Sequence, residues 1–211
     1  MNNSIEIFNK LALDYDRWFE ENRAVYEFEV SAVRRFLPPD GVGLEIGVGS
    51  GRFAVACGVK VGVEPAPAMA KLARERGITV YEAKAEALPF KDGSFDYCLL
   101  ITVICFLDDP PAVLKEASRV LKPGGRLIIG MLDRESPLGR IYNAQKSSDQ
   151  FFREARFYSA AEVKEWLSGL NFHSIEACQT VFADPCSGGQ IREGHGEGLF
   201  TVLAALKMLK K

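Results

Sequence analysis

The sequence has no apolar stretch that approaches the roughly 20 residues needed to cross a membrane as a helix. It also has no basic excess: Lys and Arg number 26 against 28 for Asp and Glu, and the net charge of −2 disfavours a nucleic-acid substrate. The N-terminus lacks a basic start followed by an apolar segment, so we see no signal peptide. We therefore expect a cytoplasmic protein with neither a nucleic-acid nor a membrane partner.

Cysteines in CxxC spacing are absent as well. The five cysteines are an odd number without paired spacing, which indicates neither a disulfide framework nor a zinc knuckle, and we expect no metal. What the chain does have is ordinary globular composition, with 47% hydrophobic and 26% charged residues over 211 positions. That length suits one α/β domain with a sizeable core.

The order of apolar patterns predicts the fold. Residues 1–38 carry apolar side chains at spacings of three and four, which indicates amphipathic helices. Short continuous apolar runs then alternate with helical patterns, as in a parallel sheet buried on both faces. The expected strands are residues 43–46, 59–63, 78–81, 97–103 and 126–131. The clearest intervening helices are residues 67–76 and 110–121.

After residue 131 the regular alternation of strand and helix patterns ends. Helices are expected at residues 136–146 and 159–167, the second with a capping box formed by Ser159 and Glu162. Strands 172–182 and 198–207 follow without a helix between them, so they should pair antiparallel. We predict a Rossmann-like α/β fold: a seven-stranded, mostly parallel sheet with helices on both faces and a C-terminal antiparallel hairpin. The expected parts of this single domain (1–211) are an N-terminal helical lid (1–38), a cofactor-binding core (42–135) and C-terminal helices with the edge hairpin (136–211).

A glycine-rich turn follows the first strand, with Gly47, Gly49 and Gly51 in the segment LEIGVGSG. Glycine permits positive φ and lets a ligand approach the backbone closely, although a tight turn without a ligand is the alternative. The dinucleotide pattern G-x-G-x-x-G needs glycine at position 52, where the chain has Arg52. Glu45, just before the turn, suits a cationic ligand better than a pyrophosphate. An NAD-dependent oxidoreductase is therefore disfavoured.

The acidic residue Glu64 ends the next apolar run and lies 19 positions after Glu45. At a strand tip it can accept hydrogen bonds from both hydroxyls of a ribose, although a solvated strand-end acid is the plainer interpretation. The loop at residues 85–96 can hold an adenine through backbone contacts and an apolar wall. Residues 121–126 form a helix stop and tight turn with a structural role.

In this order, these segments resemble the class I S-adenosylmethionine-dependent methyltransferases, in particular the group with the ubiquinone and menaquinone C-methyltransferases. The resemblance covers residues 14–135, with a weaker match at 155–159. It implies S-adenosylmethionine as cofactor and methyl transfer to a small-molecule acceptor. The implied cofactor-binding residues are Glu45, Gly47, Val48, Gly49, Gly51, Glu64, Pro65, Met69, Ala85, Glu86, Ile101 and Thr102.

The resemblance also assigns parts of the ligand. Gly47, Val48 and Gly49 would line its methionine part and Glu45 would help to hold its ammonium group. Glu64 would bind the ribose, and Ala85 and Glu86 the adenine. Two departures stand out: Lys84 replaces a usual acid, and Cys105 and Phe106 replace frequent histidines.

The acceptor side is less determined by the sequence. We expect Tyr15, Trp18 and Tyr26 of the lid, with Cys105 and Phe106, to line the substrate pocket, while plain helix packing is the alternative for the lid residues. Many class I enzymes use no general base, so the catalytic residue stays unknown, and His195 in a glycine-rich loop is a weak candidate. A non-catalytic S-adenosylmethionine-binding module or an activator subunit remains an alternative. Acceptor identity and oligomeric state are left open.

Overall fold

The computed structural model describes residues 3–184, 187 and 189–209. The helices in this part of the chain are α1 (Asn3–Lys10), α2 (Ala12–Glu21), α3 (Arg23–Arg34), α4 (Arg52–Cys57), α5 (Pro67–Glu75), α6 (Pro110–Val120), α7 (Pro137–Gln145) and α8 (Ala160–Gly169), with the 3₁₀ helices η1 (Ile104–Phe106) and η2 (Lys146–Ser148). The strands are β1 (Gly43–Ile46), β2 (Val61–Val63), β3 (Thr79–Tyr81), β4 (Phe95–Ile101), β5 (Leu121–Leu132), β6 (Phe172–Thr180), β7 (Arg192–Glu193) and β8 (Phe200–Lys207).

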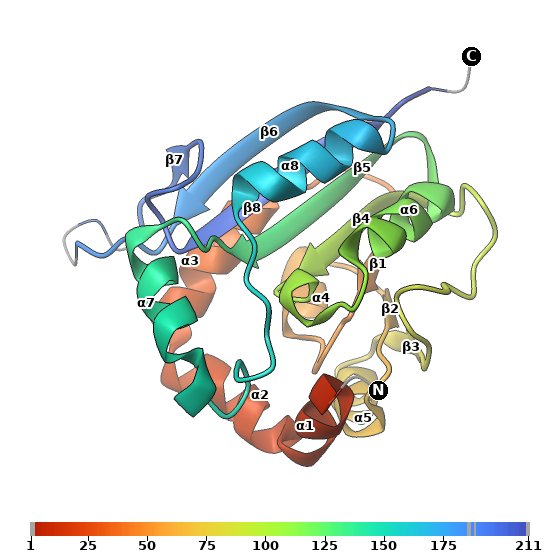
Figure 1. Ribbon diagram of the computed structural model, residues 1–211. Helices are drawn as coiled ribbons and strands as arrows, with labels where there is room; N and C mark the ends of the chain where they lie inside the picture. The colour runs from red at the N-terminus through yellow and green to blue at the C-terminus, as the bar shows by residue number, and fades with distance from the viewer. Residues whose placement is uncertain (1–2, 185–186, 188, 210–211) are drawn as a thin grey trace.

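The strands form one twisted sheet in the order β3-β2-β1-β4-β5-β8-β6-β7 (Figure 1). β1 to β5 are parallel, and β8 runs antiparallel to both β5 and β6. The predicted Rossmann-like sheet with a C-terminal antiparallel hairpin is therefore confirmed. The described residues contain eight strands instead of seven. The extra strand, β7, is two exposed charged residues in a glycine-rich link, which have no apolar pattern to reveal them.

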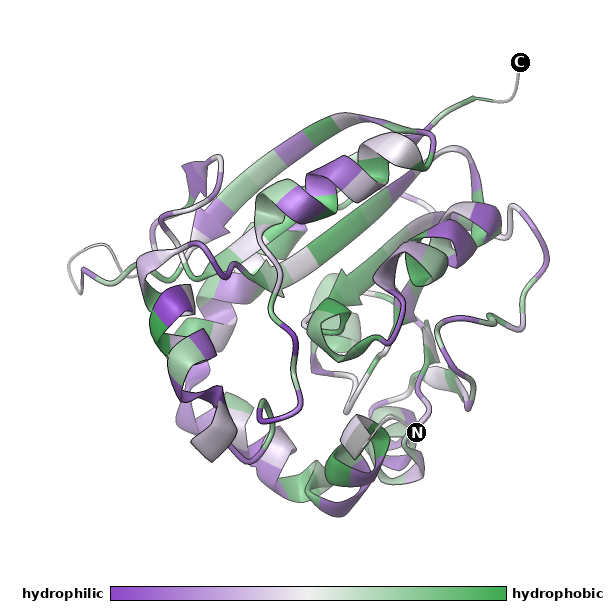
Figure 2. Ribbon diagram, viewed as in Figure 1, coloured by the Kyte–Doolittle hydropathy of each residue, from purple (hydrophilic) through white to green (hydrophobic). Residues whose placement is uncertain are grey.

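Helices cover both faces of the sheet. Apolar side chains of α6 and α8 form one core with the strands, and α3, α4 and α5 pack on the opposite face. Figure 2 shows the strands β4, β5 and β8 as largely hydrophobic, while the helices carry hydrophilic residues on their outer sides. The capping box at the start of α8 is present, since the Ser159 hydroxyl accepts from the Glu162 N–H and the Glu162 carboxylate accepts from the Ser159 N–H.

The N-terminal helices α1 and α2 lie at the end of the sheet where the parallel strands finish (Figure 1). α1 packs on α5, and the side-chain oxygen of Asn9 accepts a hydrogen bond of 2.9 Å from the Ala68 N–H in the first turn of α5. α2 is attached through Asp16, whose carboxylate lies 2.9 Å from an Arg52 nitrogen and 2.7 Å from an Arg76 nitrogen. These contacts join the N-terminal segment to both helices that flank β2.

Four cysteines in the described part of the chain, Cys57, Cys98, Cys105 and Cys178, are buried free thiols. Cys186 lies outside the described residues. Every helix that the structure describes is too short or too polar to span a lipid bilayer.

Candidate functional site

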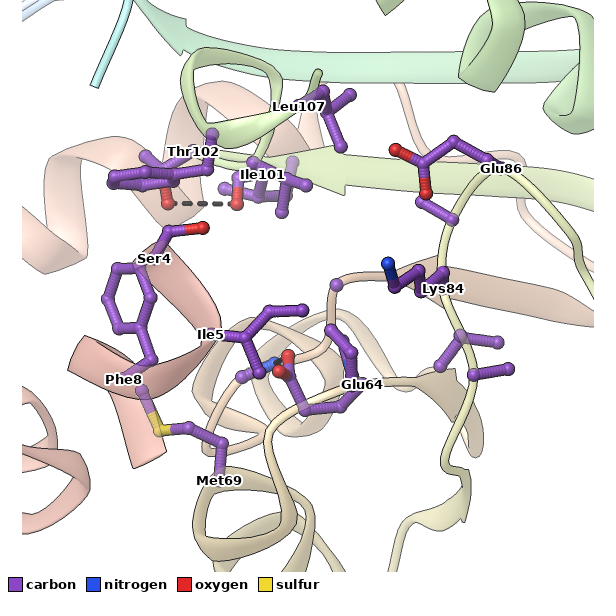
Figure 3. A pocket seen from close by; sticks show the side chains of 18 of the residues that line it. Ser4, Ile5, Phe8, Glu64, Met69, Lys84, Glu86, Ile101, Thr102 and Leu107 are labelled. Carbon is purple, nitrogen blue, oxygen red and sulfur yellow. Dashed lines mark hydrogen bonds between the residues drawn. The ribbon is translucent and has the colours of Figure 1, made fainter. Parts of the chain in front are cut away.

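A cavity with about 840 Å³ of empty space, partly open to solvent, lies at the carboxyl ends of the parallel strands. Its walls come from the segments after β1, β2, β3 and β4, and from α1 and α2 on the outer side (Figure 3). This is the edge at which open α/β sheets bind ligands.

Two glycines of the turn after β1 line this cavity. Gly47 and Gly49 have φ of 72° and 53°, in the left-handed region that favours glycine. A Cβ on Gly47 would lie 2.5 Å from a methyl carbon of Val103, so no larger residue fits there without a shift. A Cβ on Gly49 would meet no atom within 4 Å and would enter open space at the cavity wall. The turn therefore presents bare backbone to a ligand.

Glu64 lies at the end of β2 and is buried, with 7% of its surface exposed. Its carboxylate accepts hydrogen bonds of 2.9 Å from the N–H groups of Gly49 and Ala66. Burial raises the pKa of Glu64, and these two backbone donors oppose that rise. The carboxylate is thus held against the glycine turn, and each oxygen keeps acceptor capacity for a ligand hydroxyl.

The segment after β3 forms the wall opposite α1. Ala85 and Glu86 line the cavity there together with Lys84, and Pro65 and Met69 line it after β2. In Figure 3, Lys84 and Glu86 lie on one side and the side chains of α1 on the other. The loop therefore supplies an apolar wall with charged groups at its rim.

The end of β4 is strained at the cavity. Thr102 has φ of 54°, which is rare for a β-branched residue and costs about 1–3 kcal/mol. Its hydroxyl donates to the Ile101 carbonyl at 2.8 Å, and its side chain is hydrogen-bonded to Tyr15 (Figure 3). Burial raises the pKa of Tyr15, so this phenol stays protonated. Ile101, Thr102 and Tyr15 all line the cavity.

The sequence predicted a helical lid over residues 1–38 but did not indicate which side chains of α1 line the cavity. Ser4, Ile5 and Phe8 line the cavity, and the Phe8 ring packs edge-on against Phe106 at a centroid distance of 4.9 Å. Phe106 also lines the cavity, as expected for a substrate-side residue. The spacing of Phe8 indicated an amphipathic helix but not which partner its apolar side would cover.

Three predicted cofactor-binding residues do not line the cavity. Leu44 and Ile46 face the core under α6 and α8, so Glu45 between them points to the opposite face. Its carboxyl is 2% exposed, accepts from the Ala54 N–H, and has a pKa raised by burial and by the charge of Glu64. Val48 packs its side chain against Gly62 of β2, and Gly51 caps α4 close to Ala73. Glu45, Val48 and Gly51 thus do not line the cavity, and their contact with the cofactor stays a prediction.

Three predicted substrate-side residues also lie elsewhere. Trp18 packs edge-on against Phe19 of the same helix, and the Tyr26 hydroxyl donates to the Arg52 carbonyl at 2.9 Å, which joins α3 to α4. Cys105 is buried against Ala155 and Phe157, and burial raises the pKa of its thiol to about 12. None of these three residues lines the cavity, and their place in the substrate pocket stays a prediction.

His195 does not line the cavity either. It follows β7, and three strands (β5, β8 and β6) separate β7 from β4 in the sheet order. The weak candidate for a catalytic residue is thus placed at the far edge of the sheet. The half-buried side chain fits the alternative of a loop histidine without contact to the cavity.

Comparisons with known proteins agree with this geometry. Residues 44–129 match the family model of a methyltransferase domain. A solved S-adenosylmethionine-dependent methyltransferase from Thermotoga maritima, described as a possible histamine N-methyltransferase, is 46% identical with a TM-score of 0.92, covering 96% of this chain and 99% of that one. The chain belongs to the class I S-adenosylmethionine-dependent methyltransferases. An uncharacterised protein of Methanocaldococcus jannaschii is also 46% identical, over 97% of this methyltransferase and 100% of the relative.

A third comparison extends the fold to a protein with bound cofactor. A phosphoethanolamine N-methyltransferase from Haemonchus contortus in complex with S-adenosyl-L-methionine has a TM-score of 0.64 at 20% identity, covering 87% of this methyltransferase and 53% of that chain. The cofactor of this methyltransferase is S-adenosylmethionine. The residues present fit it: bare backbone at Gly47 and Gly49, a buried carboxylate at Glu64, and a cavity that these residues share with the loop after β3.

Proposed function

We propose that this methyltransferase moves the methyl group of S-adenosylmethionine to a small-molecule acceptor by in-line displacement. The observation that carries the proposal is the hydrogen bond from the Gly49 N–H to the Glu64 carboxylate, which brings the glycine turn and the strand-end acid to one cavity wall. Neither feature alone indicates the ligand. Together they offer a backbone surface for the methionine part and an acceptor for the ribose hydroxyls.

The roles of the lining residues follow from this placement. Gly47 and Gly49 would contact the methionine part, and Glu64 the ribose. Ala85 and Glu86 would border the adenine, with Pro65 and Met69 beside the adenosine. Residues 1–38 would act as a lid, since α1 forms the outer wall of the cavity.

The bound cofactor supplies an electrophilic methyl group on a positively charged sulfur, which leaves as a neutral thioether when the acceptor forms its new bond. The chain's own task is to position the acceptor and to exclude water. Phe8 and Phe106 form an apolar edge-on pair at the cavity, and Tyr15 and Thr102 fix the end of β4. Holding two reactants in line can lower the barrier by about 7–11 kcal/mol.

Small-molecule acceptors are supported by the described relatives. The Thermotoga maritima protein, with nearly the same length and fold, is described as a possible histamine N-methyltransferase. The cavity is bordered by the aromatic rings of Phe8, Tyr15 and Phe106, which suit a compact acceptor with apolar surface.

Calorimetry with S-adenosylmethionine, S-adenosylhomocysteine and NAD tests the cofactor assignment. We expect binding of the first two and none of NAD; the reverse result would indicate an oxidoreductase. A tritiated-methyl screen across amines, phenols, thiols and carbon acids then tests turnover. Binding of S-adenosylmethionine without methyl transfer to any acceptor class would favour the non-catalytic module or activator subunit.

A further inference from the structure

Two hydroxyl groups, those of Tyr15 and Thr102, meet at the wall of the cofactor cavity. Tyr15 belongs to α2 and Thr102 directly follows β4, and both side chains line the cavity. A hydrogen bond joins the two side chains (Figure 3). From α1, the end of β4 and η1, mainly apolar side chains line the cavity: Ile5, Phe8, Ile101 and Phe106. The hydroxyl pair is therefore a polar point on a largely apolar part of the wall.

The direction of the hydrogen bonds leaves this pair with acceptor capacity only. The Thr102 hydroxyl donates its single hydrogen to the Ile101 carbonyl at a distance of 2.8 Å. In the bond between the two side chains the Tyr15 phenol is therefore the donor, and burial keeps it protonated by raising its pKa. Because both hydrogens are used within the protein, the two oxygens offer lone pairs to a ligand and no donor.

Both residues are held in position by their surroundings. Thr102 has a φ of 54°, which a β-branched residue rarely adopts, and its N–H donates to the Gly130 carbonyl of β5 at 2.8 Å. Such strain persists only where the surrounding structure over-determines it, and it is concentrated at functional sites. The Tyr15 ring packs edge-on against Phe8 and Phe151, at centroid distances of 5.3 and 5.4 Å. The two oxygens are thus prearranged before a ligand binds.

The order of the strands places this pair beside the reacting end of the cofactor. The proposed contacts follow the sheet edge, with the adenine at β3, the ribose at β2 and the methionine part at β1, and β4 comes next. A Cβ on Gly47 would lie 2.5 Å from a methyl carbon of Val103, so the turn after β1 touches the segment after β4. Thr102 directly precedes Val103. The sulfur atom joins the methionine part to the ribose, and the hydroxyl pair therefore lies on its side of the cavity.

We propose that the Tyr15 and Thr102 oxygens contact the sulfonium methyl group of S-adenosylmethionine and orient it towards the acceptor. This inference rests on the proposed methyl transfer, because it concerns the same site. A positively charged sulfur polarises the C–H bonds of its methyl group, and oxygen lone pairs accept weak hydrogen bonds from C–H groups. The two residues give up no proton. The acceptor's lone pair forms the new bond to carbon, while the S–C bond pair stays on sulfur.

Sinefungin tests this contact without knowledge of the acceptor. In this cofactor analogue a carbon atom with an ammonium group replaces the sulfur and its methyl group, so N–H donors stand where the methyl group would be. S-adenosylhomocysteine has neither group at that position. We expect calorimetry on the protein to show about tenfold or more tighter binding of sinefungin than of S-adenosylhomocysteine, because the ammonium group would donate to the hydroxyl pair.

Variants separate the hydroxyl groups from the packing of their side chains. Tyr15→Phe keeps the ring and should lower the affinity for sinefungin about tenfold or more, with the affinity for S-adenosylhomocysteine nearly unchanged. Thr102→Val keeps a β-branched side chain but removes the oxygen to which Tyr15 donates, so it should also reduce the preference for sinefungin. Thr102→Ser keeps the hydroxyl group and should retain that preference.

Tyr97 of β4 provides the matched control. Its side chain does not line the cavity, so Tyr97→Phe should leave both affinities unchanged. Equal binding of sinefungin and S-adenosylhomocysteine by the wild-type protein overturns the proposal, as does a preference for sinefungin that survives in Tyr15→Phe. A fall of both affinities by the same factor in Tyr15→Phe overturns it too, since the phenol would then contact a part that the two ligands share. If the wild-type protein binds neither ligand, the proposed function itself is refuted.

Discussion

Arg52, the first residue of α4, holds Asp16 of α2 through two N–H to carboxylate hydrogen bonds of 2.9 Å each. Both side chains are mostly buried, with 18% and 15% exposed, and Arg76, directly after α5, reaches the same carboxylate. These bonds keep the pKa of Asp16 well below its usual range despite the opposing effect of burial. Arg52 stands where the dinucleotide pattern needs a glycine. Its bonds to Asp16 attach the N-terminal helices to the cofactor-binding core.

Neutralising Asp16 should loosen that attachment. We expect Asp16→Asn to lower the free energy of unfolding by about 1–3 kcal/mol, because charge-assisted bonds to two arginines are weakened in a mostly dry place. Urea unfolding measures the change. Asp14→Asn is the control, since its pair with Arg17 is exposed and should matter by less than about 0.5 kcal/mol. Equal changes in the two variants would contradict the proposed attachment.

Removing the Glu64 carboxylate should weaken cofactor binding. Losing two charge-assisted hydrogen bonds to ribose costs on the order of 2–4 kcal/mol, so Glu64→Ala should reduce the affinity for S-adenosylhomocysteine some thirty- to thousandfold in calorimetry. Glu82→Ala removes an exposed glutamate after β3 that pairs with Arg74, and it should leave the affinity unchanged. If Glu64→Ala binds S-adenosylhomocysteine with wild-type affinity, Glu64 does not bind the ribose.

Two glycines allow a separation of backbone strain from ligand contact. Gly49 and Gly58 both have positive φ and open space where a Cβ would stand, but Gly49 alone of the two lines the cavity. Each alanine variant should lose about 1–2 kcal/mol of stability from the left-handed backbone. Only Gly49→Ala should also lower the affinity for S-adenosylhomocysteine, by tenfold or more. If both variants bind equally well, the turn does not contact the ligand.

Glu29, a buried acid of α3, should make stability depend on pH. Burial raises its pKa from 4.5 to about 8, so the folded protein keeps a proton that the unfolded chain has released between these values. The resulting stabilisation is complete below pH 4.5 and is lost as the pH rises through 8, at most roughly 5 kcal/mol at 1.36 kcal/mol per pH unit. Urea unfolding at pH 5 and pH 8.5 should show a smaller difference for Glu29→Gln than for the wild-type protein. If the change in stability between pH 5 and pH 8.5 is the same in both proteins, the Glu29 carboxyl group is hydrated in the folded state.

Local patterns predicted most of the fold. The strand β4 and the part of β5 after Arg126 are mainly apolar runs, and the start of α8 carries a capping box that a sequence shows directly. The glycine turn and Glu64 were predicted together because strand ends of a parallel sheet meet at one edge. β7 was missed, since two charged residues pair with β6 through their backbone alone.

The predicted site residues that do not line the cavity differ from the others in the direction in which their side chains point. Glu45 lies on a strand buried on both faces, where alternation gives no outer side and the sequence does not say which face meets the ligand. Trp18 and Tyr26 lie on helices whose packing partners are distant in the chain. Glu29 did leave a signal, because it follows Tyr26 by three residues and precedes Val33 by four on one apolar helix face. A lone acid at such a position is the mark of a buried polar group.

The short helix α1 has a consequence for the timing of the reaction. It closes one side of the cavity with Ser4, Ile5 and Phe8, and its polar tie to α5 is the hydrogen bond between Asn9 and Ala68. Because α1 forms one wall of this partly open cavity, a movement of α1 would widen the exit for spent cofactor and expose the rings of Phe8 and Phe106 to water. Where product release limits the reaction, the rate at which α1 moves would then set the turnover rate, and a tighter attachment of α1 to α5 would lower that rate.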